Sequence, residues 1–126
     1  MKEKITIYHN PRWRKSREAV LLLKNKGLKL DIIEYLKHPL DKKLLLSLSK
    51  MLSLRPKKFV RTTESIFKQL ELRQNLENDE VLFKAMVEYP KLIQRPIVVV
   101  GNKAILGRPP EKVLDLLMWV WIIFSL

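Results

Sequence analysis

The chain has 126 residues, of which 47% are hydrophobic, enough for one core and typical of a single domain spanning residues 1–126. Its 25 lysines and arginines exceed its 13 acidic residues, for a net charge of +12. This charge favours an anionic partner such as nucleic acid, a membrane surface or a small oxyanion. A basic surface without a dedicated partner explains the charge equally well. The chain contains no cysteine, which excludes disulfides, thiolate metal sites and catalysis by a thiol of this chain.

The N-terminal residues predict a strand that is followed closely by a helix. Residues 4–8 (KITIY) have the β-branched and aromatic content of a strand, and the turn residues HNP at 9–11 end it. Over residues 13–26 the apolar side chains fall on one helical stripe, and Gly27 is expected to end the helix. Because no apolar signal-peptide core follows Met1, we expect a cytoplasmic protein.

A second strand at residues 30–35 (LDIIEY) completes a β-α-β unit, whose two strands should be parallel. Residues 41–90 then predict a helical insertion. Its predicted segments are a helix capped by Asp41 and ending near Leu52, a helical turn over 55–61, a short helix over 63–72 capped by Thr62 or Thr63, and a helix capped at Asn78-Asp79 and ending at Glu88.

Strands return at residues 96–100 (PIVVV) and 103–106 (KAIL), and the Gly-Asn pair between them is typical of an antiparallel hairpin. A last helix is expected from Glu111. The order β-α-β, helices, β-β-α is that of an α/β thioredoxin-like fold. The expected architecture is a mixed four-stranded sheet with a helical insertion between its second and third strands.

Residues 5–17 (ITIYHNPRWRKSR) form the junction at which we expect chemistry. A helix that begins just after a strand directs unpaired N–H groups and the positive end of its dipole at one place, which suits an anion or a thiolate. The predicted topology turns Arg61, Arg95 and Arg108 toward this place. Converging guanidinium groups would form a cradle for a tetrahedral oxyanion. From spacing alone, these three residues can also be explained as ordinary surface arginines among the many in the chain.

Several stretches of the chain resemble the glutaredoxin-linked arsenate reductases, which have the thioredoxin fold. The matching stretches are HNP at 9–11, KSRE at 15–18, the RTTE-like segment that contains Arg61, RPIVVV at 95–100 and GRPPE at 107–111. The resemblance extends to about Leu117. It implies a reaction in which a cysteine thiolate attacks arsenate, three arginines hold the oxyanion, and glutathione with glutaredoxin completes the reduction to arsenite.

The resemblance also implies roles for individual residues. These are Arg61, Arg95 and Arg108 as oxyanion-binding groups, His9, Asn10 and Ser16 as neighbours of the thiolate, and Pro96 as the cis-proline. The expected ligand is therefore a small oxyanion such as arsenate, phosphate or sulfate, and no bound cofactor is expected. His9 and His38 lie in different elements, and no carboxylate cluster accompanies them, so no metal site is expected either.

Trp13 stands where this family places its catalytic cysteine, and Arg14 follows where a small residue is usual. An indole has no group that attacks a substrate and then leaves, so the family's reaction is predicted to be absent. Because this chain has no thiol for them to reduce, glutathione and glutaredoxin are not expected to act on it. The indole either fills the oxyanion pocket or changes its shape. The origin of Trp13 stays open between an evolved residue, an engineered change and a sequence error.

Residues 116–126 form an apolar tail that is atypical of the family. The unbroken apolar run from Leu116 to Phe124 is shorter than the about 20 residues that a bilayer-spanning helix needs, so no transmembrane segment is expected. Three interpretations stay open: a last element packed on the sheet, a segment that docks on a membrane interface or a partner, and a frameshifted stretch.

Two hypotheses of function follow. The first is a monomeric, arsenate-reductase-like protein that is catalytically inactive and retains an oxyanion-binding site. The alternative is a binding or regulatory protein, because a related thioredoxin-fold branch resembles transcription regulators that contact RNA polymerase. Specific binding of nucleic acid is not expected, since the sequence has no helix-turn-helix or stacking-aromatic pattern.

Overall fold

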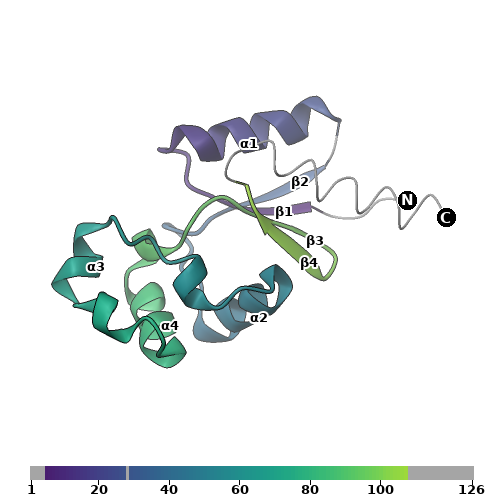
Figure 1. The fold of residues 1–126 in the computed structure, drawn as a ribbon. Coiled ribbons are helices and arrows are strands. Elements are labelled where there is room, and N and C mark those ends of the chain that lie inside the picture. Colours follow the sequence, from purple (N-terminus) through teal and green to yellow (C-terminus); the bar gives the residue numbers. More distant parts are fainter. Residues whose placement is uncertain (1–4, 28, 108–126) are drawn as a thin grey trace. The chain divides into compact units, whose positions relative to one another are not determined.

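The structure is a computed structural model that describes residues 5–27 and 29–107. The chain divides into two compact units, Met1–Glu34 with Arg95–Leu126, and Tyr35–Gln94, which we call the sheet unit and the helical unit (Figure 1). The elements of the sheet unit are β1 (Ile5–His9), α1 (Arg14–Asn25), β2 (Leu30–Glu34), β3 (Ile97–Val100) and β4 (Lys103–Leu106).

The described strands form one four-stranded sheet in the order β2-β1-β3-β4. The central strand β1 pairs with β2 in parallel, as a β-α-β unit requires, and with β3 antiparallel. In this register Ile7 lies opposite Ile32 on one side and Val98 on the other. The hairpin of β3 and β4 is antiparallel and turns at Gly101, whose φ of +60° is in the left-handed region that favours glycine. The predicted mixed sheet and the insertion between its second and third strands are confirmed.

Helix α1 packs on one face of this sheet through the apolar stripe predicted from its sequence (Figure 1). The buried side chains of this core are Ile5, Ile7, Ala19, Val20, Leu23, Val98 and Val100. Alternate residues of β1 and β3 supply the sheet side because successive strand side chains point to opposite faces. Each large aliphatic side chain buried in this way stabilises the fold by about 1.5–3 kcal/mol. The helix ends as predicted, with Gly27 at a φ of +72°.

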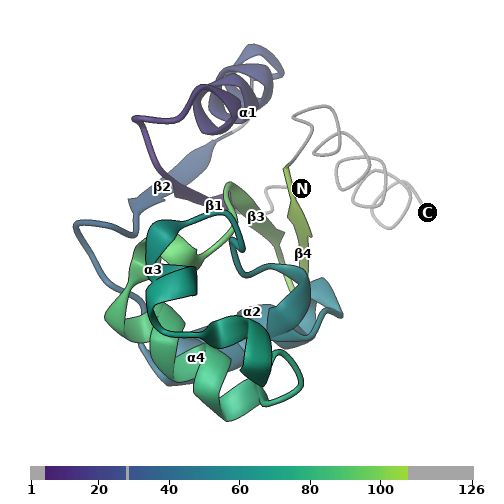
Figure 2. The ribbon, with the colours of Figure 1, turned by 60° about the vertical axis from the view of Figure 1, so that its left-hand side comes forward.

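The helical unit contains α2 (Lys42–Leu52), α3 (Ser65–Gln69) and α4 (Asp79–Glu88), which Figure 2 shows from a second side. Short 3₁₀ helices at Pro56–Lys58, Leu72–Asn75 and Pro90–Leu92 join and extend them. The caps predicted at Asp41 and Asn78 are confirmed, because each side chain accepts a hydrogen bond from a backbone N–H in the first turn of its helix.

The predicted short helix over residues 63–72 is wrong in both its limits and its cap. Helix α3 is shorter, and the residue at its N-cap is Glu64, which makes no side-chain cap hydrogen bond. Its end is set by Glu71, whose φ of +52° is left-handed and therefore interrupts a right-handed helix before Leu72. Neither Thr62 nor Thr63 caps it, since both precede the N-cap residue.

Two distant segments of the helical unit pair as a short antiparallel bridge, residues 59–61 with residues 92–94. The Arg61 N–H donates to the Leu92 carbonyl over 2.7 Å. At one end of this unit, the buried Tyr35 hydroxyl donates to the Ile93 carbonyl over 3.2 Å. These bonds fix the backbone of Arg61, one of the predicted site residues, within its unit.

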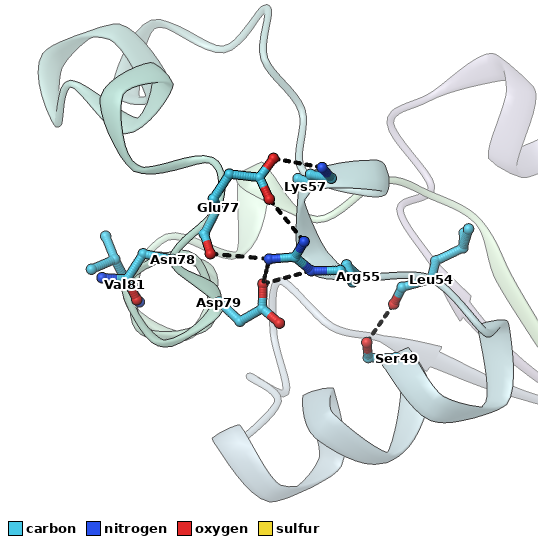
Figure 3. Close-up of polar contacts among 8 residues, drawn as sticks. All are labelled: Ser49, Leu54, Arg55, Lys57, Glu77, Asn78, Asp79 and Val81. Atoms are coloured by element: carbon cyan, nitrogen blue, oxygen red, sulfur yellow. Dashed lines mark hydrogen bonds and ion pairs between the residues drawn. The ribbon is translucent and has the colours of Figure 1, made fainter.

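A network of charged side chains joins the segment after α2 to the start of α4 (Figure 3). The Arg55 guanidinium donates to the Asp79 carboxylate over 2.9 Å and to the Glu77 carboxylate over 2.8 Å, and Lys57 donates to Glu77 over 2.6 Å. Hydrogen bonds from Lys57 and Arg55 lower the pKa of Glu77. Because these groups are exposed, water weakens each pair, and the stabilisation depends on the network as a whole.

No helix within residues 5–27 and 29–107 is both long enough and apolar enough to cross a bilayer. The apolar tail 116–126 and the helix expected from Glu111 lie outside the described residues.

The cap of α2 yields a first prediction. Asp41→Ala removes the carboxylate that accepts the Leu44 N–H over 2.8 Å, so the free energy of unfolding should fall by about 1 kcal/mol. Urea denaturation followed by circular dichroism measures this change. The matched control is Asp41→Asn, which keeps an acceptor and should remain close to the wild type. Equal losses in the two variants would contradict a capping role for this side chain.

Candidate functional site

The loop between β1 and α1 places Trp13 at the N-cap of the helix. The Trp13 N–H donates to the Asn10 carbonyl, and the Trp13 carbonyl accepts the Arg17 N–H, both over 3.1 Å. The indole has no oxygen acceptor and makes no side-chain cap. The first-turn N–H groups, which have no partner within a helix, are therefore not capped by the residue at position 13.

A buried network of polar groups links the end of β1 to the first turn of α1. The Ser16 hydroxyl accepts the Asn10 N–H over 3.1 Å and lies 2.6 Å from His9 Nδ1. The Asn10 side chain in turn accepts the Arg12 N–H over 3.1 Å. His9, Asn10 and Ser16 are all buried. The structure thus brings together the three residues predicted to support the site.

The surroundings of His9 favour its uncharged form. Burial lowers the pKa of its imidazole, because a low-dielectric surrounding disfavours the cation, and the positive charges of Arg17 and Lys24 act in the same direction. Glu34 acts against them more weakly than burial does. A neutral ring allows the Ser16 hydroxyl to donate to Nδ1 while it accepts from Asn10.

Trp13 and Arg95 are far apart in the sequence and in contact in the fold. The Arg95 Cζ atom lies 3.7 Å from the centroid of the Trp13 ring. This separation lies well within the range of a cation–π contact. The side chain of Arg95 is 2% exposed, whereas Trp13 is 42% exposed. The ring at the predicted nucleophile position therefore covers a buried cation that was predicted to hold the oxyanion.

The peptide bond between Arg95 and Pro96 is cis, as the resemblance implied.

The other two predicted arginines are placed differently. Arg61 lies in the helical unit, where its Nε donates to the Glu64 carboxylate over 3.2 Å and its Nη1 to the Gln94 side-chain carbonyl over 3.0 Å. Its charge is therefore already balanced by a carboxylate. Arg108 lies outside the described residues. A cradle formed by all three arginines stays a prediction.

Sequence reasoning missed both partners of Arg61. Glu64 follows it at i+3, a spacing that favours contact between side chains in a turn or helix, so the RTTE segment carried a usable signal. Gln94 is 33 residues away and is brought close by the pairing of residues 59–61 with 92–94, for which the sequence offers no periodic pattern.

Cations dominate the exposed surface at the start of α1. Arg12, Arg14 and Lys15 are exposed, and the first turn of the helix contains no acidic residue. Arg14 pairs with Glu18 over 2.8 Å. The excess of positive charge and the positive end of the helix dipole lie at the same place, which favours the approach of an anion.

A family model described as the ArsC family matches residues 8–116. The chain belongs to the ArsC family. It is 43% identical over 117 residues to the uncharacterized protein YfgD of Escherichia coli (strain K12), covering 92% of this chain and 98% of that protein. It is 44% identical over 115 residues to an arsenate reductase of Haemophilus influenzae, covering 90% of this chain and 98% of the relative.

Solved structures give the same result. The arsenate reductase from Vibrio cholerae superposes with a TM-score of 0.87 at 41% identity, covering 91% of this chain and 98% of that one. A putative arsenate reductase from Yersinia pestis gives a TM-score of 0.83 at 41% identity, covering 88% of this chain and 98% of that one. The resemblance to arsenate reductases is thereby confirmed, and with it the thioredoxin-like fold. This ArsC-family chain contains no cysteine.

The buried imidazole yields a second prediction. The pKa of His9 in the folded state is lower than the value of about 6.5 expected for the unfolded chain, so the unfolded state binds a proton first as the pH falls. The stability contributed by neutral His9 is complete above about pH 6.5 and is lost as the pH falls through the folded-state pKa. The free energy of unfolding should therefore decrease from about pH 7.5 to about pH 5.5.

Urea denaturation of the wild type and of His9→Gln at both pH values measures this effect. The variant should lose less stability across the interval, because glutamine does not titrate. An NMR titration of the imidazole, assigned by its absence in His9→Gln, reports the pKa directly. The prediction is wrong if the two proteins show the same pH dependence.

Proposed function

We propose that this chain is an ArsC-family protein that retains an oxyanion-binding frame and has lost the reductase chemistry. The observation that carries the proposal is Trp13 at the N-cap of α1 in a chain without cysteine. The resemblance places the thiolate that attacks arsenate at this position. An indole cannot form and then break the covalent bond that nucleophilic catalysis requires.

Two features support a retained frame around the missing nucleophile. The His9, Asn10 and Ser16 network is complete and buried. Arg95 contacts the residue at the N-cap of α1, so a guanidinium, the helix dipole and exposed cations lie near one place. The expected ligand is a small tetrahedral oxyanion such as arsenate, phosphate or sulfate, because guanidinium donors match the spacing of its oxygens.

Glutathione and glutaredoxin are not expected to act on this chain. Thiol–disulfide exchange requires a cysteine on the protein that is to be reduced. The proposed function is therefore binding of an oxyanion without turnover.

An assay of arsenate reduction tests the loss of chemistry. With arsenate, glutathione and glutaredoxin, the wild type should form arsenite at the same background rate as Trp13→Ala, because neither protein has a thiol. The arsenate reductase of Haemophilus influenzae serves as the positive control. A wild-type rate above that of Trp13→Ala would overturn the proposed inactivity.

Restoring the thiol tests the retained frame. The double variant Trp13→Cys with Arg14→Ser places a thiol at the start of α1, where the helix dipole lowers a thiol pKa, and should gain glutathione- and glutaredoxin-dependent arsenite formation. Replacing Arg14 should cost little stability, since its side chain is 81% exposed and its ion pair with Glu18 lies at the surface.

The matched control is Trp13→Ser with Arg14→Ser, which has the same small side chains without a thiol and should stay at background. A cysteine variant that folds, as judged by circular dichroism, and yet forms no arsenite would count against a retained frame.

A further inference from the structure

We propose that the Trp13 indole is an internal competitor of the oxyanion at Arg95, so that an anion reaches this arginine only after the ring has moved away. The proposal rests on the function proposed above, because it concerns the same arginine. It adds a mechanism that controls anion binding at the site, because the residue at the nucleophile position also contacts and covers the Arg95 guanidinium.

Burial limits the access of an anion to Arg95. Charge-assisted hydrogen bonds from a guanidinium to an oxyanion need donor and acceptor atoms about 2.7–2.9 Å apart. With Arg95 only 2% exposed, a dissolved anion cannot reach that distance in the described state. The Trp13 ring, 3.7 Å from the guanidinium carbon, is one of the groups that cover it.

The Trp13 ring is the part of this contact that can move. Trp13 is 42% exposed, so its side chain borders solvent. Its backbone is held by the bonds of its N–H to Asn10 and of its carbonyl to Arg17, and rotation about the side-chain bonds leaves both intact. Arg95 is buried, so a comparable movement of its side chain would disturb packed surroundings.

The strength of the cation–π contact sets the expected size of the effect. Moving the ring sacrifices its cation–π contact with Arg95, and the apparent anion affinity falls by the fraction of molecules in which the ring is away. The usual strength of such contacts corresponds to a weakening of about 2- to 30-fold. Removing the ring should restore that factor, since Arg12, Arg14 and Lys15 supply the same surrounding charge in the variant and in the wild type.

The experiment is isothermal titration calorimetry with arsenate and, separately, with phosphate. Trp13→Ala should bind each anion about 2- to 30-fold more tightly than the wild type. Trp13→Leu keeps much of the bulk without the ring, and thereby separates steric covering from the cation–π contact. In an Arg95→Gln background, Trp13→Ala should give no gain, because the anion would no longer have this arginine to bind.

The outcomes separate this proposal from the proposed function. Equal affinities of the wild type and Trp13→Ala would overturn the competition while leaving oxyanion binding in place. A gain that persists with Arg95→Gln would overturn it as well, since the anion would then bind elsewhere. Absence of binding in every protein would overturn both the competition and the oxyanion-binding frame.

Fluorescence gives a second readout that does not require substitution of the buried arginine. With Trp119→Phe and Trp121→Phe, Trp13 is the remaining tryptophan of the chain. Saturating phosphate should shift its emission to longer wavelength and increase its quenching by acrylamide, because the displaced ring becomes more exposed to water. Unchanged emission at an anion concentration that calorimetry shows to be saturating would contradict displacement of the ring.

Discussion

The buried hydroxyl of Ser16 is the constraint on which the candidate site depends. It accepts the Asn10 N–H and lies within hydrogen-bond distance of His9, so one oxygen joins the last residue of β1, the connecting loop and the first turn of α1. The helix start therefore has a fixed position relative to the central strand. Because Trp13 is the N-cap of that helix, the same constraint fixes the backbone position from which its ring reaches Arg95.

This arrangement separates two properties of a reductase site that usually occur together. Positioning depends on backbone geometry, on the Ser16 network and on a buried guanidinium, and none of these needs a thiol. Covalent chemistry depends on one atom with a lone pair that attacks and then leaves. Under the proposed function, replacing that atom by an indole removes the chemistry, whereas His9, Asn10 and Ser16 form their buried network without it. Membership of this fold family is therefore not by itself evidence that a protein catalyses the family's reaction. The residue at the start of α1 distinguishes a member with a nucleophile from one without.

The sequence predicted the features that depend on local pattern and on the order of the elements, and could not predict individual side-chain contacts between distant residues. Apolar alternation and the Gly-Asn pair specified β1, β3, β4 and their hairpin, and the side chains of Asp41 and Asn78 marked two helix starts. The short helix failed because a left-handed residue, Glu71, has no side-chain signature that sets it apart from a helix former. The topology predicted that Arg95 lies near the junction at residues 5–17, but not that the Trp13 ring contacts its guanidinium, since neither residue carries information about its side-chain partner.

A buried guanidinium is stabilised by charge or polarity close to it, and the residue at position 13 is one source of this at Arg95. Removing a cation from water costs several kcal/mol unless charge or polarity nearby offsets it. Arg61 receives this compensation from a carboxylate, Glu64. At Arg95 a thiolate at position 13 would supply a full negative charge, whereas the indole supplies the negative face of its π system. A small aliphatic residue would supply neither. Tryptophan at position 13 thus lacks a nucleophile and still contributes to the stability of the buried arginine, which is consistent with the proposed function of a binding frame without the reaction.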